Sequence, residues 1–222
     1  MKTIKNLIFD LDGTLIDSSE GIIDAVNFAL EQTGQPARSP EDIKRYIGSP
    51  LEQMFRDFTD YPFAELNRQF RTRADTSVVA AAVPLDGVQG ILEMLHLAGY
   101  RMALATTKVR RNIDGIITKL GWQDYFQVAV GGDEVTNVKP APDAFNFVLG
   151  RLGASPDESI VVGDTVNDII AARAVPIRVI AVSSPFASRE DVVKSGPDYF
   201  IRNIAWLPGL LVEVDRKSVK AK

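Results

Sequence analysis

After Pro84 the chain alternates regularly between short apolar segments and helix-like segments, and no other feature restricts its fold as much. The apolar segments lack polar alternation, which is typical of strands buried on both faces of a parallel sheet. The predicted strands are 4–9, 102–106, 126–130, 159–162 and 178–182, and the predicted helices are 87–98, 112–120, 142–152 and 167–174. We therefore expect an α/β fold, a doubly wound parallel sheet with a Rossmann-like three-layer core.

A helical stretch separates the first predicted strand from the others. Between Asp17 and Pro84, apolar residues such as Ile22, Val26 and Leu30 recur at intervals that predict helices. We expect a small helical bundle inserted into the α/β fold. The core domain would comprise residues 1–16 and 85–222, and the inserted domain residues 17–84. The basic tail, residues 216–222, is expected to be a frayed end.

Composition and charge exclude several classes of function. Lys and Arg number 25 against 29 Asp and Glu, so no positive field favours nucleic acid or an anionic membrane. The absence of cysteine excludes thiol catalysis and cysteine-ligated metals. No apolar run approaches the roughly 18 residues of a membrane span, and early acidic residues argue against a signal peptide. We expect a cytoplasmic protein, monomeric or homodimeric.

Polar residues stand where the predicted strands end or in the loops that follow them. They are Asp10, Asp12, Thr106, Lys139, Asp164 and Asp168. In doubly wound sheets, ligands bind at the carboxyl ends of the strands. These side chains are therefore expected to form one site.

Carboxylates dominate this predicted site. Asp10 and Asp12 would face one reaction centre if the strand continues through them. Their repulsion, together with that of Asp164, calls for a cation, and oxygen ligands suit Mg²⁺. One carboxylate can attack phosphorus to give an aspartyl phosphate, while a second protonates the leaving oxygen and later activates water. Asp10 and Asp12 fit these two roles.

Other residues of the site could bind phosphate oxygens. Lys139 could supply positive charge, Thr106 a hydroxyl donor, and the turn after Asp10 backbone N–H groups. Gly13 would let that turn approach the phosphate, because glycine has no Cβ.

Four motifs in chain order carry a family resemblance. They are Asp10-Leu11-Asp12-Gly13-Thr14, Leu104-Ala105-Thr106, Lys139-Pro140-Ala141-Pro142-Asp143 and Val162-Gly163-Asp164-Thr165-Val166-Asn167-Asp168. On these motifs the sequence resembles the haloacid dehalogenase superfamily of phosphohydrolases. The first motif and Gly131-Gly132-Asp133 are similar to its phosphoglycolate phosphatase-like members.

The resemblance implies a role for each matching residue. Asp10 would be the nucleophile and Asp12 the general acid and base. The phosphate and substrate would be bound by Gly13, Thr106, Thr107 and Lys139. Mg²⁺ would be held by the Asp10 carboxylate, the Asp12 backbone carbonyl and Asp164, with Asp168 supporting them directly or through water. The helical insertion would be a cap that closes over the site and selects the substrate.

The leading prediction is a Mg²⁺-dependent phosphatase for a small phosphomonoester, phosphoglycolate-like or sugar-phosphate-like, acting through an aspartyl phosphate. Its expected partner is a small phosphorylated metabolite. A phosphosugar mutase with the same core residues is the alternative enzyme. A phospho-acceptor without turnover, or a binding protein, is the alternative from another class. Asp12 disfavours dehalogenation, because dehalogenating members of the superfamily lack an acid there.

Some residues also have plainer interpretations. Asp168 could cap the following helix. Lys108 could take the place of Lys139, although a lysine near the start of a helix is more often exposed, and His96 is expected to have no catalytic role. Arg68, Arg71 and Arg73 of the insertion could meet an anionic substrate, although a charged helix face is usually solvated. The segment 47–50 is either a substrate-contacting loop or a helix break.

Overall fold

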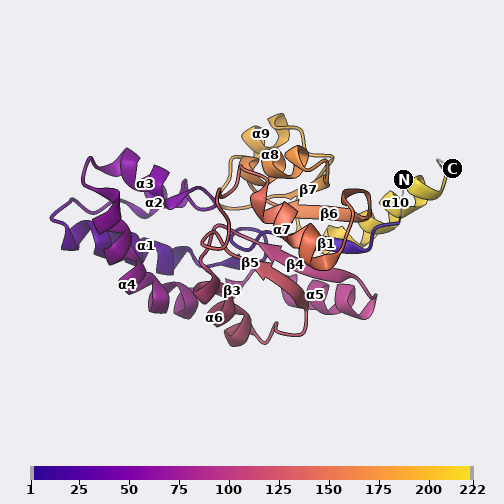
Figure 1. Ribbon diagram of the computed structural model, residues 1–222, viewed down its shortest axis with the longest axis horizontal. Helices are drawn as coiled ribbons and strands as arrows, with labels where there is room; N and C mark the ends of the chain where they lie inside the picture. The colour runs from indigo at the N-terminus through magenta and orange to yellow at the C-terminus, as the bar shows by residue number, and fades with distance from the viewer. Residues whose placement is uncertain (1–2, 221–222) are drawn as a thin grey trace.

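The predicted parallel sheet forms the centre of the molecule. In residues 3–220, which the computed structural model describes, six parallel strands lie in the order β5-β4-β1-β6-β7-β8 (Figure 1). They are β1 (Asn6–Phe9), β4 (Arg101–Ala105), β5 (Phe126–Val130), β6 (Ser159–Gly163), β7 (Arg178–Val182) and β8 (Tyr199–Ile201). Strand β1 pairs with both β4 and β6, so the first strand of the chain lies inside the sheet.

Helices cover both faces of the sheet, as the apolar strands predict. Leu7 and Phe9 pack into the hydrophobic cluster on one face, and Ile8 packs into that on the other. The first cluster includes residues of α5 (Val88–Leu97), α6 (Arg110–Leu120) and α10 (Leu207–Lys220); the second includes residues of α7 (Asp143–Leu152), α8 (Val166–Ala174) and α9 (Arg189–Lys194). The predicted doubly wound α/β fold is confirmed.

Four helices of the described chain lie between β1 and α5, at one end of the molecule (Figure 1). They are α1 (Ser19–Gln32), α2 (Pro40–Lys44), α3 (Leu51–Phe58) and α4 (Phe63–Ala81). We call residues 19–81 the helical insert. The buried residues of α4 recur every four positions, at Leu66, Phe70, Ala74 and Val78, which gives the helix an apolar face toward α1.

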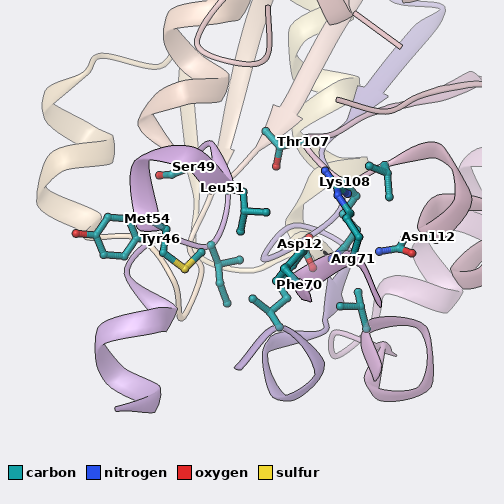
Figure 2. A pocket seen from close by; sticks show the side chains of 15 residues that line it. Asp12, Tyr46, Ser49, Leu51, Met54, Phe70, Arg71, Thr107, Lys108 and Asn112 are labelled. Carbon is teal, nitrogen blue, oxygen red and sulfur yellow. Dashed lines mark ion pairs between the residues drawn. The ribbon is translucent and has the colours of Figure 1, made fainter. Parts of the chain in front are cut away.

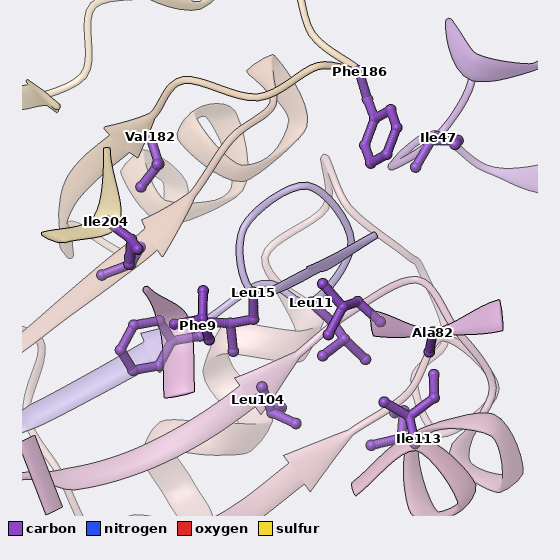
Figure 3. Packing of buried hydrophobic residues seen from close by; sticks show 14 of the residues in the cluster. Phe9, Leu11, Leu15, Ile47, Ala82, Leu104, Ile113, Val182, Phe186 and Ile204 are labelled. Carbon is purple, nitrogen blue, oxygen red and sulfur yellow. The ribbon is translucent and has the colours of Figure 1, made fainter. Parts of the chain in front are cut away.

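Two short strands join the helical insert to the α/β part. Strand β2 (Ile16–Asp17) pairs antiparallel with β3 (Val83–Pro84), so the chain leaves and re-enters the α/β part side by side. Ile47 and Ala82 belong to the same hydrophobic cluster as Phe9 (Figure 3). The helical insert therefore packs continuously against the core rather than standing apart from it.

The region after Val182 contains α9, β8 and α10, none of which the sequence analysis predicted. The prediction of a frayed tail is wrong for residues 216–220, because these residues continue α10. Residues 221–222, the rest of that predicted tail, lie outside the described residues. Leu207, Leu211 and Val214 bury one face of α10, and this packing against the sheet holds the helix in place.

Among the described residues, the helices are too short or too polar to cross a bilayer.

Candidate active site

The predicted site residues lie together at the carboxyl ends of the central strands. Asp10 directly follows β1, Thr106 follows β4 and Asp164 follows β6. The ionisable members, Asp10, Asp12, Lys139, Asp164 and Asp168, are each at most 5% exposed. Charged groups are rarely buried to this extent unless they compensate one another.

Lys139 lies between two of the carboxylates. Its Nζ donates hydrogen bonds to Oδ1 of Asp10 and Oδ1 of Asp168, both at 2.6 Å, and to the carbonyl oxygen of Ala105 at 3.0 Å. Burial works against the charged ammonium, but the charges of Asp10 and Asp168 outweigh it and raise the pKa of Lys139. A fixed positive charge therefore stands beside Asp10.

The buried carboxylates carry more negative charge than Lys139 neutralises. Burial raises the pKa of Asp10 to about 7, although Lys139 acts in the opposite direction. Burial, and next the charge of Asp10, raises the pKa of Asp164 well above its usual range. A further cation at this place would favour the ionised form of both groups.

Asp164 offers a place for such a cation. Its Oδ1 accepts a hydrogen bond from Oγ1 of Thr14 at 2.9 Å, whereas its buried Oδ2 has no hydrogen-bond partner among the described residues. Carboxylate oxygens of Asp10, Asp164 and Asp168 lie within 4.8 Å of one another. A buried set of oxygen ligands with one unpartnered atom fits Mg²⁺.

Gly13 keeps the space beside that oxygen open. Its φ is +78°, and a Cβ at this position would lie 2.2 Å from Oδ2 of Asp164. Any other residue would be strained in this conformation and would fill the space next to the carboxylate. The turn after β1 therefore requires glycine for the site to exist in this form.

Asp168 has a structural role as well as a place in the acidic group. Its Oδ2 accepts a hydrogen bond from the N–H of Thr165 at 3.0 Å, and its own N–H donates to Oγ1 of Thr165 at 3.4 Å, which together form a capping box at α8. Asp168 therefore helps to cap this helix, although the N-cap residue itself is Thr165. Because its Oδ1 accepts from Lys139, Asp168 also fixes the ammonium next to Asp10.

Asp12 points to a different set of partners. Its Oδ1 accepts a hydrogen bond from Oγ of Ser18 at 2.5 Å, and its Oδ2 pairs with Nζ of Lys108 at 2.8 Å. The expectation that Lys108 is exposed is wrong, since its side chain is only 7% exposed. Lys108 precedes α6 and turns back toward β1. The sequence did contain a signal that Lys108 belongs to the site: it lies two residues after Thr106, and the segment that follows a strand end borders the site.

A pocket opens beside Asp12, between the α/β part and the helical insert (Figure 2). About 80 Å³ of it is open to water-sized molecules, several times the roughly 10–15 Å³ that one water needs. The α/β part contributes Asp12, Thr107, Lys108, Val109 and Asn112, and the helical insert contributes Ile22, Tyr46, Ile47, Gly48, Ser49, Leu51, Met54, Phe70, Arg71 and Val78. The segment 47–49 lines this pocket, as a substrate-contacting loop would. The pocket has room for a small molecule only.

A family model described as haloacid dehalogenase-like hydrolase matches residues 7–182. The chain belongs to this family. A pyrophosphatase PpaX from Halalkalibacterium halodurans is 30% identical over 219 residues, 99% of each chain. A phosphoglycolate phosphatase from Yersinia pestis is 32% identical over 212 residues, 92% of this chain and 91% of that one. A solved haloacid dehalogenase-like family hydrolase from Streptococcus pneumoniae, 25% identical, covers 95% of this chain and 99% of its own with a TM-score of 0.87.

The family match and the phosphatase names of these relatives confirm the prediction that the chain is an enzyme of the phosphatase type.

The structure also places Thr106 and Thr107, the two predicted phosphate- and substrate-binding threonines. Thr106 is buried, and its Oγ1 accepts a hydrogen bond from the N–H of Lys108 at 3.3 Å. Thr107 lines the pocket. His96 is exposed, with its ring centroid 5.6 Å from that of Tyr125, away from the pocket residues.

Proposed function

We propose that this hydrolase is a Mg²⁺-dependent phosphatase that transfers the phosphoryl group of a small phosphomonoester to Asp10 and then to water. One observation carries the proposal. The Asp10 carboxylate is buried at the end of the central strand β1, is held by Lys139 at 2.6 Å, and stands within the group that contains the unpartnered Oδ2 of Asp164.

In the first step, Oδ2 of Asp10 attacks phosphorus, since Oδ1 accepts from Lys139. The bond from phosphorus to the ester oxygen breaks, and that oxygen takes the electron pair together with a proton from Asp12. In the second step, Asp12 takes a proton from water, the water oxygen attacks phosphorus, and Asp10 is released with its carboxylate restored. Inorganic phosphate and the free alcohol are the products.

The surrounding residues lower the cost of charge on the phosphoryl oxygens. Lys139 supplies a positive charge that needs no reorganisation, and Thr106 with the backbone of the Gly13 turn supplies hydrogen-bond donors. Asp10 and Asp164, the backbone carbonyl of Asp12 and, directly or through water, Asp168 would hold Mg²⁺, which when bound adds positive charge at the same oxygens.

We further propose that residues 17–84 act as a cap that selects the substrate. The pocket beside Asp12 lies between this segment and the α/β part, so the groups that contact the ester's leaving portion come largely from the cap. Relatives are named phosphoglycolate phosphatase and pyrophosphatase. Phosphoglycolate is therefore the first substrate to test.

The proposal is tested by measuring hydrolysis of p-nitrophenyl phosphate and phosphoglycolate with added Mg²⁺ and with a chelator. We expect turnover that the chelator abolishes and Mg²⁺ restores. Asp10→Asn should lower kcat roughly a thousandfold or more, because the amide is a poor nucleophile. The matched control is Asp24→Asn, whose carboxylate pairs with Arg73 on the exposed side of the helical insert. Turnover without metal, or Asp10→Asn within tenfold of wild type, would refute the proposal.

A further inference from the structure

Helix α4 carries three arginines, and the structure gives two of them the same environment. Nη2 of Arg68 pairs with Glu65 at 2.5 Å, and Nε of Arg73 pairs with Asp24 at 2.6 Å. Both arginine side chains are exposed. Their charges are thus neutralised at the surface of the helical insert, where an ion pair contributes little.

Arg71 lies in a different environment. It is partly buried and lines the pocket beside Asp12 (Figure 2). Its Nε donates to the amide oxygen of Asn67 at 3.2 Å, and within the described part of the chain its guanidinium forms no ion pair. Burial lowers the pKa of Arg71, while the charges of Asp133 and Asp75 act against this. The group stays charged, because an arginine side chain is not deprotonated in proteins.

Asn112 of α6 lines the same pocket from the α/β part, and Figure 2 shows it on the same side as Arg71 and Lys108. It is 4% exposed, and its buried Oδ1 has no hydrogen-bond partner among the described residues. Leaving a buried polar atom unpaired costs free energy, so the described residues do not use the full hydrogen-bonding capacity of this amide. Figure 2 shows its nitrogen on the side of Lys108 and Arg71, where its N–H groups can donate to a ligand oxygen.

Lys108 is less suited to such a group, because Asp12 already balances the charge of its Nζ and Ser18 accepts a second hydrogen bond from it. Arg71 therefore supplies a positive charge in the pocket that forms no ion pair within residues 3–216, although the charges of Asp133 and Asp75 act on it. A guanidinium has a planar fork of N–H donors that matches the two oxygens of a carboxylate or a phosphate. Partial burial strengthens such a contact.

We infer that Arg71 recognises a second anionic group of the substrate, a carboxylate or a phosphate close to the phosphoryl group, with the amide of Asn112 as an additional donor. The inference rests on the proposed phosphatase function and narrows it. Asp12 and Arg71 line one pocket in which only about 80 Å³ is open, so the two anionic groups are a few atoms apart. The substrate class is then short phosphomonoesters of hydroxy acids, or compounds with two phosphates.

The test compares three substrates that differ in the second group: phosphoglycolate, inorganic pyrophosphate and the neutral analogue 2-hydroxyethyl phosphate. For wild type, Arg71→Met, Arg71→Lys and the control Arg68→Met, we would measure kcat and KM with Mg²⁺, after thermal melting has shown that each variant folds. Arg68 is the matched control, since it lies three residues away on the same helix and is exposed.

We expect the kcat/KM ratio of an anionic substrate over 2-hydroxyethyl phosphate to fall tenfold or more in Arg71→Met. Arg71→Lys should lie between Arg71→Met and wild type, and Arg68→Met should match wild type. A fall for phosphoglycolate identifies a carboxylate, and a fall for pyrophosphate alone identifies a phosphate. An unchanged ratio, or an equal fall in Arg68→Met, would overturn the inference while leaving the phosphatase intact. If wild type hydrolyses p-nitrophenyl phosphate but none of the three, the inference fails and the phosphatase stands; if it hydrolyses none of the four, both fail.

Discussion

Charges in the α/β part and in the helical insert are arranged in opposite ways. In the α/β part, Asp10, Lys139 and Asp168 are almost fully buried, and both carboxylates bond to the ammonium of Lys139. In the helical insert, pairs such as Glu52 with Arg56 lie one helical turn apart on exposed faces. A buried ionic network is stable only when every member has its partners, whereas an exposed pair contributes about 0–1 kcal/mol.

This difference assigns separate tasks to the two regions. The buried network holds one geometry, which suits a reaction whose main requirement is positioned charge. The helical insert can change its surface charges at little cost in stability, which is compatible with the substrate-selecting role proposed above for its pocket-lining residues. Arg71 is the exception among the arginines of the insert, because it points into the pocket rather than pairing at the surface.

The largest effect should come from breaking the buried network at its centre. Lys139→Met removes the ammonium between two carboxylates, so we expect a loss of roughly 10²–10³ in kcat and of about 3 kcal/mol in the free energy of unfolding. Hydrolysis of p-nitrophenyl phosphate and urea denaturation measure the two quantities. Lys5→Met is the control, because Lys5 pairs with Glu158 at an exposed position and should change stability by less than about 1 kcal/mol. Equal effects of the two substitutions would remove the contrast between buried and exposed charge.

A second, smaller effect separates backbone strain from the space that Gly13 keeps open. Gly13→Ala and Gly34→Ala both place a side chain at a positive φ, +78° and +70°, and this backbone conformation should by itself cost about 1 kcal/mol of stability in each. Only the Cβ at Gly13 would meet Asp164; the one at Gly34, in the helical insert, would meet nothing within 4 Å. We therefore expect Gly13→Ala to reduce kcat tenfold or more and to weaken Mg²⁺ binding, measured by calorimetry. Activity of Gly13→Ala equal to that of Gly34→Ala would contradict this account.

The two regions also differ in how far sequence predicts them. The strands and the residues at their ends follow from the apolar segments, because parallel strands bring their carboxyl ends to one edge. The sequence did not predict that Arg71 lines the pocket while Arg68 and Arg73 form ion pairs at the surface. Neighbouring positions on a helix differ by about 100° in direction, so the pattern alone does not fix which arginine enters the pocket.

Other features depended on contacts that the local pattern does not contain. The pairing of Lys108 with Asp12 joins residues far apart in the chain. The β2–β3 pair is only two residues long on each side, too short to give a periodic signal. Helix α10 is fixed by burial of residues such as Leu211 beside the sheet, although its basic end resembles a solvated tail.

The smallest predicted effect concerns the contact between the two regions. Nδ2 of Asn167 donates to the carbonyl oxygen of Gly48 at 3.2 Å, across the boundary between α8 and the helical insert. Asn167→Ala removes this bond, so KM for phosphoglycolate should rise by a factor of about 2–10 with kcat nearly unchanged. Asn27→Ala breaks two hydrogen bonds with the backbone of Arg38, one to its carbonyl oxygen and one from its N–H, inside the helical insert, and should leave KM unaffected. A larger fall in kcat than rise in KM would show that this contact serves the chemistry rather than binding.

In the proposed mechanism, the phosphoryl group passes through Asp10 of the buried network. The most direct measurement is rapid mixing of Asp12→Asn with p-nitrophenyl phosphate and Mg²⁺, followed by acid quenching and mass spectrometry of the peptides. Because p-nitrophenolate leaves without a proton, the first step should proceed while the second is slowed. We predict a phosphorylated peptide with the modification on Asp10. A burst of p-nitrophenol without any phosphorylated peptide, or phosphorylation at another residue, would contradict the account.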